Sequence, residues 1–343
     1  MALFPLMFSY KDQIIDESQY MWGPITSTID WCEENYVVSS YFAEFINATT
    51  NLSFFYLSML NLRSCIKNKH EFIFQVVSVG MCIVGLGSWF FHMTLKYEFQ
   101  LLDELPMIYV TAIPFSYILT IDIATNKSGI SSTTTNPNPI KKSKNFLSSH
   151  KAQSIAIYSA NLFFVLGITI YYIFINQNPV FHEVCYALLN FGLIYKIYQL
   201  INRVVSYKSL QMYMLKLMAF SVGEFLFGFI LWNIDNKCCS NLRSLRRSYL
   251  GFPLGIVLEL HGWWHILTSL GIYHFIVVNQ MLSVWHRGEQ ENYRLVWKYG
   301  ILGQVVLNEN INNNSRFQTI VELTEDTNKS DSDNDSEDKI KVN

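Results

Sequence analysis

The sequence predicts an all-α integral membrane protein, built as a bundle of seven transmembrane helices. Half of its 343 residues are hydrophobic and only 15% are charged, and the mean hydropathy is positive at +0.18, as is typical of polytopic membrane proteins. The net charge of −2 argues against a nucleic acid as partner. Seven apolar runs have close to the roughly 20 residues that a bilayer core requires, and they cover residues 44–62, 72–94, 102–121, 153–175, 180–201, 211–232 and 252–282.

Residues 1–43 precede the first run and are polar and aromatic. The opening MALFPLMF lacks the basic start and the cleavage site of a secretory signal, so the first span is expected to direct insertion. Seven spans put the termini on opposite sides, and lysine and arginine are in excess in the loops on the C-terminal side. We therefore expect a lumenal N-terminal segment and a cytosolic C-terminus. A cluster of arginines at 243, 246 and 247, on the N-terminal side, opposes this excess.

The transmembrane domain is expected to cover residues 44–285. Its first span is unusually polar, which favours hydrogen bonds to neighbouring helices. Residues 122–152 are rich in Ser, Thr, Asn and Pro and predict a flexible cytosolic loop. Residues 286–343 predict a cytosolic acidic tail that is largely disordered, because its composition provides too little apolar surface to bury.

The stretch GLGSWFFHMTLKYEFQLLDELP, residues 85–106, carries polar side chains inside or beside two of these runs. Ionisable groups at such depth are costly and mark functional sites. Ser88 and His92 are four residues apart and share a helix face, and a short turn could return Asp103 to them. A lone histidine here would more often be a structural residue. Glu104 is a second carboxylate beside them.

The stretch LELHGWWHILT, residues 258–268, supplies a second motif. His261 and His265 are also four residues apart in an apolar helix, a spacing that can chelate one cation. Together with His92 they would complete three protein ligands and leave a fourth position open for water. This is the arrangement of a catalytic zinc site.

The N-terminal segment carries oxygen ligands of the kind that calcium prefers, at Asp30, Glu33, Asn35 and Glu44. Their spacing is not that of an EF-hand. From the residues alone, a solvated acidic segment preceding a helix is the simpler interpretation.

Three of the six cysteines, Cys32, Cys238 and Cys239, fall on the side that the topology assigns to the oxidising lumen. We expect a disulfide between Cys32 and Cys239, which would tie the N-terminal segment to the loop before the seventh span.

Four strings of the sequence, WGPITSTIDWCEENY, GSWFFHMTLKYEFQLLDELPMIY, WNIDNKCCSNLR and LHGWWHILT, resemble the alkaline ceramidase family over about residues 22–285. The family consists of seven-span membrane amidases that hydrolyse ceramide, with the endoplasmic reticulum or the Golgi as expected location. The resemblance implies catalytic zinc on His92, His261 and His265, with assistance from Ser88 and Asp103. It also implies structural or regulatory calcium on Asp30, the carbonyl of Trp31, Glu33, Asn35 and Glu44. Gly262 stands where the family leads us to expect alanine.

The expected reaction is hydrolysis of the amide of ceramide, including phytoceramide or dihydroceramide, to a sphingoid base and a fatty acid. Zinc would activate a water, Asp103 would transfer its proton, and Ser88 would donate to the oxyanion. An acyl-enzyme on Ser88 is a disfavoured alternative. The ceramide lipid and the bilayer are the expected partners, and no obligate protein partner is evident.

Two other functions use similar residues. A zinc-containing lipid-sensing receptor of the progestin and adiponectin receptor type would signal without turnover, and a metal transporter would use the histidines as a transit site. His70, His182 and His274 are expected to be structural. Glu259 is expected to be a polar group beside the metal, and Glu224 has no partner that the sequence identifies.

Overall fold

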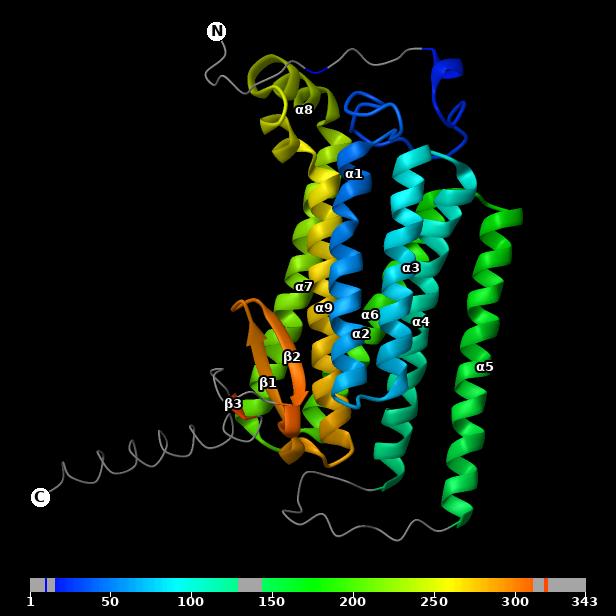
Figure 1. The fold of residues 1–343 in the computed structure, drawn as a ribbon. Helices are drawn as coiled ribbons and strands as arrows, with labels where there is room; N and C mark the ends of the chain where they lie inside the picture. Colours follow the sequence, from blue (N-terminus) through cyan, green and yellow to red (C-terminus); the bar gives the residue numbers. More distant parts are fainter. Residues whose placement is uncertain (1–9, 11–15, 129–143, 311–317, 320–343) are drawn as a thin grey trace, which may run out of the picture.

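A computed structural model of the chain describes residues 10, 16–128, 144–310 and 318–319, and it is mainly helical (Figure 1). A short 3₁₀ turn, Glu17–Gln19, precedes the bundle. The helices and strands that follow are α1 (Phe45–Thr50), α2 (Leu52–Lys67), α3 (Phe72–Thr94), α4 (Tyr97–Ser128), α5 (Lys144–Phe174), α6 (Pro179–Val204), α7 (Lys208–Lys237), α8 (Cys239–Leu245), α9 (Leu260–His286), β1 (Tyr293–Lys298), β2 (Leu302–Leu307) and β3 (Gln318–Thr319).

Six helices in the described part of the chain are long and apolar enough to cross a membrane, namely α3, α4, α5, α6, α7 and α9. The prediction of a helical membrane bundle is therefore confirmed. The seven-span count is not, because the first expected span, residues 44–62, is divided between two shorter helices, α1 and α2.

The division between α1 and α2 falls at Asn51, a fully buried residue. Its backbone N–H donates to the Ala48 carbonyl, three residues back, and its side chain donates to the Asn47 carbonyl at 3.0 Å. Figure 1 shows α1 and α2 stacked end to end, so together they follow one path through the bundle. Ser53 in this path accepts a hydrogen bond from Ser269 of α9 at 2.8 Å, as its polarity predicts.

The turn between α3 and α4 brings the two halves of the first motif together. Leu95 ends α3 with a left-handed backbone, at φ 52°, and α4 begins two residues later. Gly87 then lets the helices approach closely, because a Cβ atom there would lie only 2.1 Å from the Leu102 carbonyl oxygen. Close packing at this point places the start of α4 beside the last turns of α3.

A β-hairpin lies against α2, α7 and α9 at the end of the bundle away from α8 (Figure 1). Strands β1 and β2 pair antiparallel, with Leu295 opposite Val305, and β3 pairs with β1. His70 donates from Nε2 to the Val305 carbonyl at 2.7 Å, and the Tyr273 hydroxyl donates to the Gly303 carbonyl at 2.8 Å. The sequence had predicted no regular structure after residue 286.

The polar residues that lacked partners in the sequence acquire them in the fold. Glu224 of α7 lies with Oε2 2.7 Å from Nδ1 of His274 in α9, whose Nε2 lies 3.0 Å from the Ile301 carbonyl. His182 makes a 2.7 Å hydrogen bond to the Glu104 carbonyl. These histidines hold helices and hairpin together, in agreement with their expected structural role.

Two predicted segments fall partly outside the described residues. Helices α4 and α5 extend into the stretch 122–152 that was expected to be a loop, and residues 129–143 within it are not described. The acidic end of the expected tail, residues 320–343, also lies outside the described part.

Candidate active site

The three histidines of the two motifs converge at one point inside the bundle. His92 comes from the last turns of α3, and His261 and His265 come from the first turns of α9. Each side chain offers one nitrogen such that the three atoms lie within 4.8 Å of one another. All three residues are at most 4% exposed, so the cluster is shielded from bulk water.

Hydrogen bonds fix the rings of two of these histidines. Nδ1 of His92 lies 2.5 Å from Oε2 of Glu44, and Nδ1 of His265 lies 3.0 Å from the hydroxyl of Thr50. The Thr50 hydroxyl donates its own proton to the carbonyl of Ile46, so it accepts from His265. Protons on both Nδ1 atoms leave the Nε2 lone pairs available to a metal, the usual arrangement for a metal-binding histidine.

The third ring is held by stacking. The indole of Trp31 lies over His261 with a ring-centroid distance of 4.3 Å and an interplanar angle of 29°. Nδ1 of His261 is buried and has no hydrogen-bond partner among the described residues. A buried imidazole nitrogen without a partner beside two others is the donor set of a divalent transition metal, and three imidazoles with an open position suit zinc.

Ser88 and Asp103 meet beside this cluster. Ser88 is one turn before His92 on α3 and is 3% exposed, and its side chain lies beside the Asp103 carboxyl at the start of α4. The neighbouring Glu104 is engaged elsewhere, because it accepts hydrogen bonds from the Tyr172 hydroxyl and the Gln100 side chain. Of the two adjacent carboxylates, Asp103 is therefore the one suited to chemistry.

The residues expected to bind calcium lie in one segment but already make contacts with the chain. Asp30 accepts a hydrogen bond from the Asn35 amide at 3.3 Å. Glu33 accepts from the first backbone N–H groups of α1, those of Ile46 and Asn47, at 2.7 and 2.8 Å. Among the described residues, the clustering that identifies the three histidines does not extend to these carboxylates.

The charge and burial of this segment nevertheless suit a hard cation. Burial, together with the nearby Glu44, raises the pKa of Glu33 to about 8, because two buried carboxylates repel one another. Oδ1 of Asn35 is buried and has no hydrogen-bond partner among the described residues. A buried carboxylate pair with an available amide oxygen is the donor chemistry of a calcium site.

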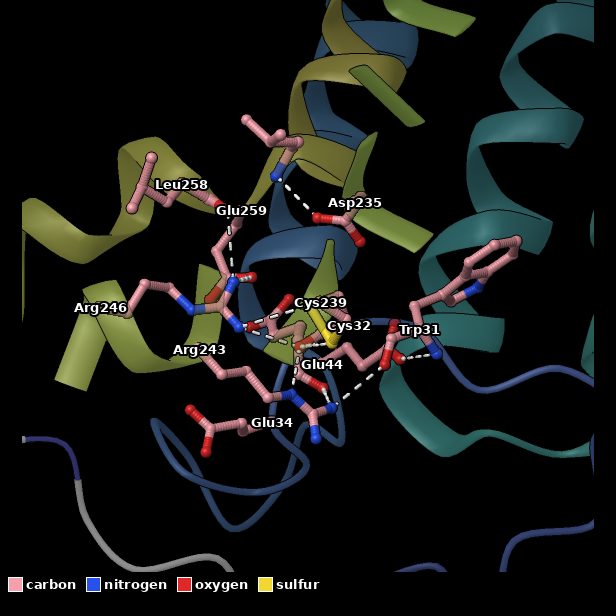
Figure 2. Close-up of a disulfide and its surroundings, with 12 residues drawn as sticks. Trp31, Cys32, Glu34, Glu44, Asp235, Cys239, Arg243, Arg246, Leu258 and Glu259 are labelled. Atoms are coloured by element: carbon pink, nitrogen blue, oxygen red, sulfur yellow. Dashed lines mark hydrogen bonds and ion pairs between the residues drawn. A yellow bond between two sulfur atoms is a disulfide. The ribbon is translucent and has the colours of Figure 1, made fainter. Parts of the chain in front are cut away.

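A disulfide joins Cys32 of the N-terminal segment to Cys239 at the start of α8, with their Cα atoms 5.3 Å apart (Figure 2). Around it lie Arg243 and Arg246, two residues for which the sequence predicts no role in the site. In the sequence they are only part of a cluster of arginines that follows Cys239. The Cys32 carbonyl, which both arginines contact, lies more than 200 residues away along the chain.

Together, the fold and the site define a class: a helical integral membrane protein with a buried cluster of three histidines that could bind a metal ion. The chain belongs to the alkaline ceramidase family. The family model described as Ceramidase matches residues 23–306, so the match extends past residue 285 and includes nearly all of the hairpin. As a member of this family, the protein is a hydrolase of the ceramidase type.

The relatives agree with this assignment. The chain is 37% identical to alkaline ceramidase YPC1 of Saccharomyces cerevisiae over 288 residues, which are 83% of this chain and 86% of the yeast protein. It is 37% identical to alkaline ceramidase 3 of Mus musculus over 263 residues, 77% of this chain and 86% of the mouse protein. It is 38% identical to alkaline ceramidase 1 of Homo sapiens over 94 residues, 26% of this chain and 35% of the human protein.

Proposed function

We propose that this protein hydrolyses the amide bond of ceramides, including phytoceramide or dihydroceramide, within the membrane, and releases a free sphingoid base and a fatty acid. The observation that carries the proposal is the buried convergence of His92, His261 and His265 in a membrane protein of the alkaline ceramidase family. A two-chained lipid can reach such a site from the bilayer, where apolar helices would hold its chains.

The proposal includes zinc, with His92, His261 and His265 as its ligands. When bound, zinc supplies Lewis acidity, which lowers the pKa of a water towards neutrality and polarises a carbonyl. Glu44 and Thr50 would keep the Nε2 atoms of His92 and His265 directed at the ion, since each holds the opposite nitrogen of the ring.

The protein's own groups would handle the protons and the oxyanion. A carboxylate oxygen of Asp103 would take the proton of the attacking water and pass it to the sphingoid nitrogen as that nitrogen leaves. The Ser88 hydroxyl, which lies beside Asp103, would direct its proton to the developing oxyanion. Water thus adds across the C–N bond, giving an acid and an amine.

Ser88 is less suited to act as a nucleophile. A serine needs a base to remove its proton, and the imidazoles nearest in sequence and space would be committed to the metal. We therefore assign Ser88 to stabilisation of charge and Asp103 to proton transfer.

The proposal assigns calcium to the N-terminal segment, on Asp30, the carbonyl of Trp31, Glu33, Asn35 and Glu44. Neutralisation of the buried pair Glu33 and Glu44 by a divalent cation would remove their repulsion. Because Glu44 also bonds His92 and Glu33 caps α1, calcium would order the same elements that hold the histidines.

We further propose that α1 and α2 together form a seventh span and that the N-terminal end of the bundle faces the lumen of the endoplasmic reticulum or Golgi. The disulfide at this end is consistent with an oxidising compartment. The arginine cluster that opposed this orientation is paired within the protein, since Arg246 contacts Glu259 and Arg247 contacts Glu34.

The experiment is release of free sphingoid base from a panel of ceramides, phytoceramides and dihydroceramides by the purified protein, measured by mass spectrometry beside His261→Ala. The proposal predicts release by the native protein and loss of at least ~10²-fold in the variant. If the folded, zinc-loaded protein released no base from any ceramide, hydrolysis would be excluded. A zinc-containing lipid-sensing receptor would then be the favoured function.

A further inference from the structure

We propose that Arg246 is a positioning residue for the metal cluster. It holds the backbone of residues 31–33 against the start of α9, and those residues in turn orient all three histidines. The effect on turnover rests on the proposed function, whereas the effect on the position of the segment does not.

Arg246 is a fully buried arginine in the π-helical turn Arg246–Leu250 that follows α8. Its Nη2 donates to the Cys32 carbonyl at 2.9 Å, and its Nη1 donates to the Leu258 carbonyl at 3.3 Å and to the carboxylate of Glu259. Figure 2 shows the guanidinium between Cys32 on one side and Glu259 on the other. One rigid fork thus joins the N-terminal segment to the residue that precedes α9.

Two neighbouring arginines extend this contact. Nε of Arg243 donates to the same Cys32 carbonyl at 2.8 Å, and its Nη2 lies 3.4 Å from the carbonyl oxygens of Trp31 and Glu33. Nε of Arg247 lies 2.7 Å from a carboxylate oxygen of Glu34. The three side chains, which we call the arginine cluster, engage four consecutive residues of the N-terminal segment.

Trp31 connects the arginine cluster to His92 and His261. The Trp31 N–H donates to Oε1 of Glu44 at 3.1 Å, and Oε2 of Glu44 is the partner of His92. The indole of Trp31 stacks on His261. A shift of the Cys32 carbonyl would therefore change the positions of the His92 and His261 imidazoles.

The third histidine is reached through α1. Glu33 accepts hydrogen bonds from the N-terminal amides of α1, and α1 ends with Thr50, whose hydroxyl bonds His265. Each metal-binding imidazole therefore touches a group whose position depends on residues 31–33. The disulfide fixes the side chain of Cys32. Arg243 and Arg246 both hold its carbonyl, and Arg246 also ties that carbonyl to the residues that precede α9.

A competing explanation is that Arg246 only neutralises Glu259. Loss of one partner of a buried ion pair is strongly destabilising, whereas replacement of both by apolar residues is often tolerated. The two explanations therefore differ in a variant that removes both charges. If Arg246 only balances charge, that variant behaves like the native protein, and if Arg246 positions the segment, the loss of the Cys32 contact remains.

The test compares Arg246→Lys and the double variant Arg246→Met with Glu259→Met. Arg287→Gln is the matched control, because it removes an arginine that pairs with Glu289 next to the hairpin. Thermal stability, hydrogen exchange of peptides covering residues 29–36 and 44–50, and the rate of zinc removal by a chelator are measured on detergent-purified full-length protein.

We expect the double variant to have a Tm close to that of the native protein. Its amide hydrogens in both peptides should nevertheless exchange at least ~10-fold faster, and a chelator should remove its zinc ~10-fold faster. Arg246→Lys keeps the charge but its single ammonium does not span Cys32 and Glu259, so the same peptides should accelerate. Arg287→Gln should change neither the hydrogen exchange of these peptides nor the rate of zinc loss. Native exchange in both Arg246 variants would overturn the proposal.

Turnover provides a separate readout. A positioning role predicts a lower kcat with little change in KM for ceramide, since no contact with the lipid is removed. If the native protein released no sphingoid base, the proposed function would fail, while hydrogen exchange would still decide the role of Arg246.

Discussion

Nδ1 of His92 lies 2.5 Å from Oε2 of Glu44, and this contact joins the three-histidine cluster to the carboxylate segment before α1. Both side chains are almost fully buried. The same Glu44 accepts from the Trp31 N–H and from the Asn47 amide. One carboxylate therefore orients a metal-binding ring and belongs to the proposed calcium site.

Glu44→Gln should weaken zinc binding by ~10 to 100-fold, because the amide is a poorer acceptor for the His92 N–H and no longer raises the basicity of the ring. Zinc content after dialysis against graded chelator measures the effect. Glu98→Gln removes an exposed carboxylate in the first turn of α4, and serves as control. Equal zinc retention in Glu44→Gln and the native protein would contradict this role.

Asp103→Asn should lower kcat by ~10² to 10⁴-fold, since the amide does not accept and return the proton. Ser88→Ala should cost ~10² to 10³-fold through loss of an oxyanion donor. Both variants should keep their zinc, because neither residue belongs to the histidine cluster. Near-native kcat in Asp103→Asn would contradict its assigned role in proton transfer, and trapping of an acyl group on Ser88 would establish the acyl-enzyme route.

Calcium binding should strengthen as the pH rises towards 8. A carboxyl whose pKa is raised to about 8 in the fold, as that of Glu33 is, binds more protons folded than unfolded between about pH 4 and 8, so without a cation its contribution to stability falls across this window. Calcium competes with that proton. The calcium-induced rise in Tm should therefore grow from pH 6 to pH 8 and level off above.

Glu33→Gln removes one of the titrating ligands and should weaken this pH dependence. An equal calcium-induced shift at pH 6 and pH 8 in the native protein would count against calcium at Glu33.

Cys32→Ser should destabilise the fold by about 2–5 kcal/mol, the usual cost of losing a native disulfide, and lower Tm accordingly. Cys238→Ser is a close control, because Cys238 is the exposed neighbour of Cys239 and has a free thiol. Non-reducing peptide maps should show a linked pair of peptides containing Cys32 and Cys239 in the native protein and in Cys238→Ser. A non-reducing peptide map that Cys32→Ser leaves unchanged would contradict the pairing.

The pairing of His261 and His265 on one helix face was predictable from spacing and hydropathy, whereas the addition of His92 was implied by the family resemblance. His261 and His265 share a face at a four-residue interval, and an apolar helix must place them inside the bundle or facing lipid. The return of Asp103 towards His92 through the short turn between α3 and α4, in contrast, was predictable only as a possibility. This turn depends on the left-handed backbone of Leu95, and the close approach of the two helices depends on the absence of a side chain at Gly87.

The hairpin and the arginine cluster were not predicted, for different reasons. Strands β1 and β2 are six residues each and follow a polar stretch, so their local signal was short, although Tyr299 and Gly300 form a turn with positive φ. Arg246 was counted only as a surface charge. Its burial depends on Cys32 and Glu259 together, and a local pattern does not reveal partners brought in by tertiary packing.

Zinc bound by the three histidines is proposed to drive ceramide hydrolysis. The most direct measurement is metal content of the purified protein by mass spectrometry, followed in parallel with sphingoid base release during chelation and zinc return. We predict one zinc per chain, and release of sphingoid base that falls as zinc is removed and recovers when zinc is restored. His261→Ala should contain no zinc and release no base. Full ceramide hydrolysis by metal-free protein would contradict the central claim.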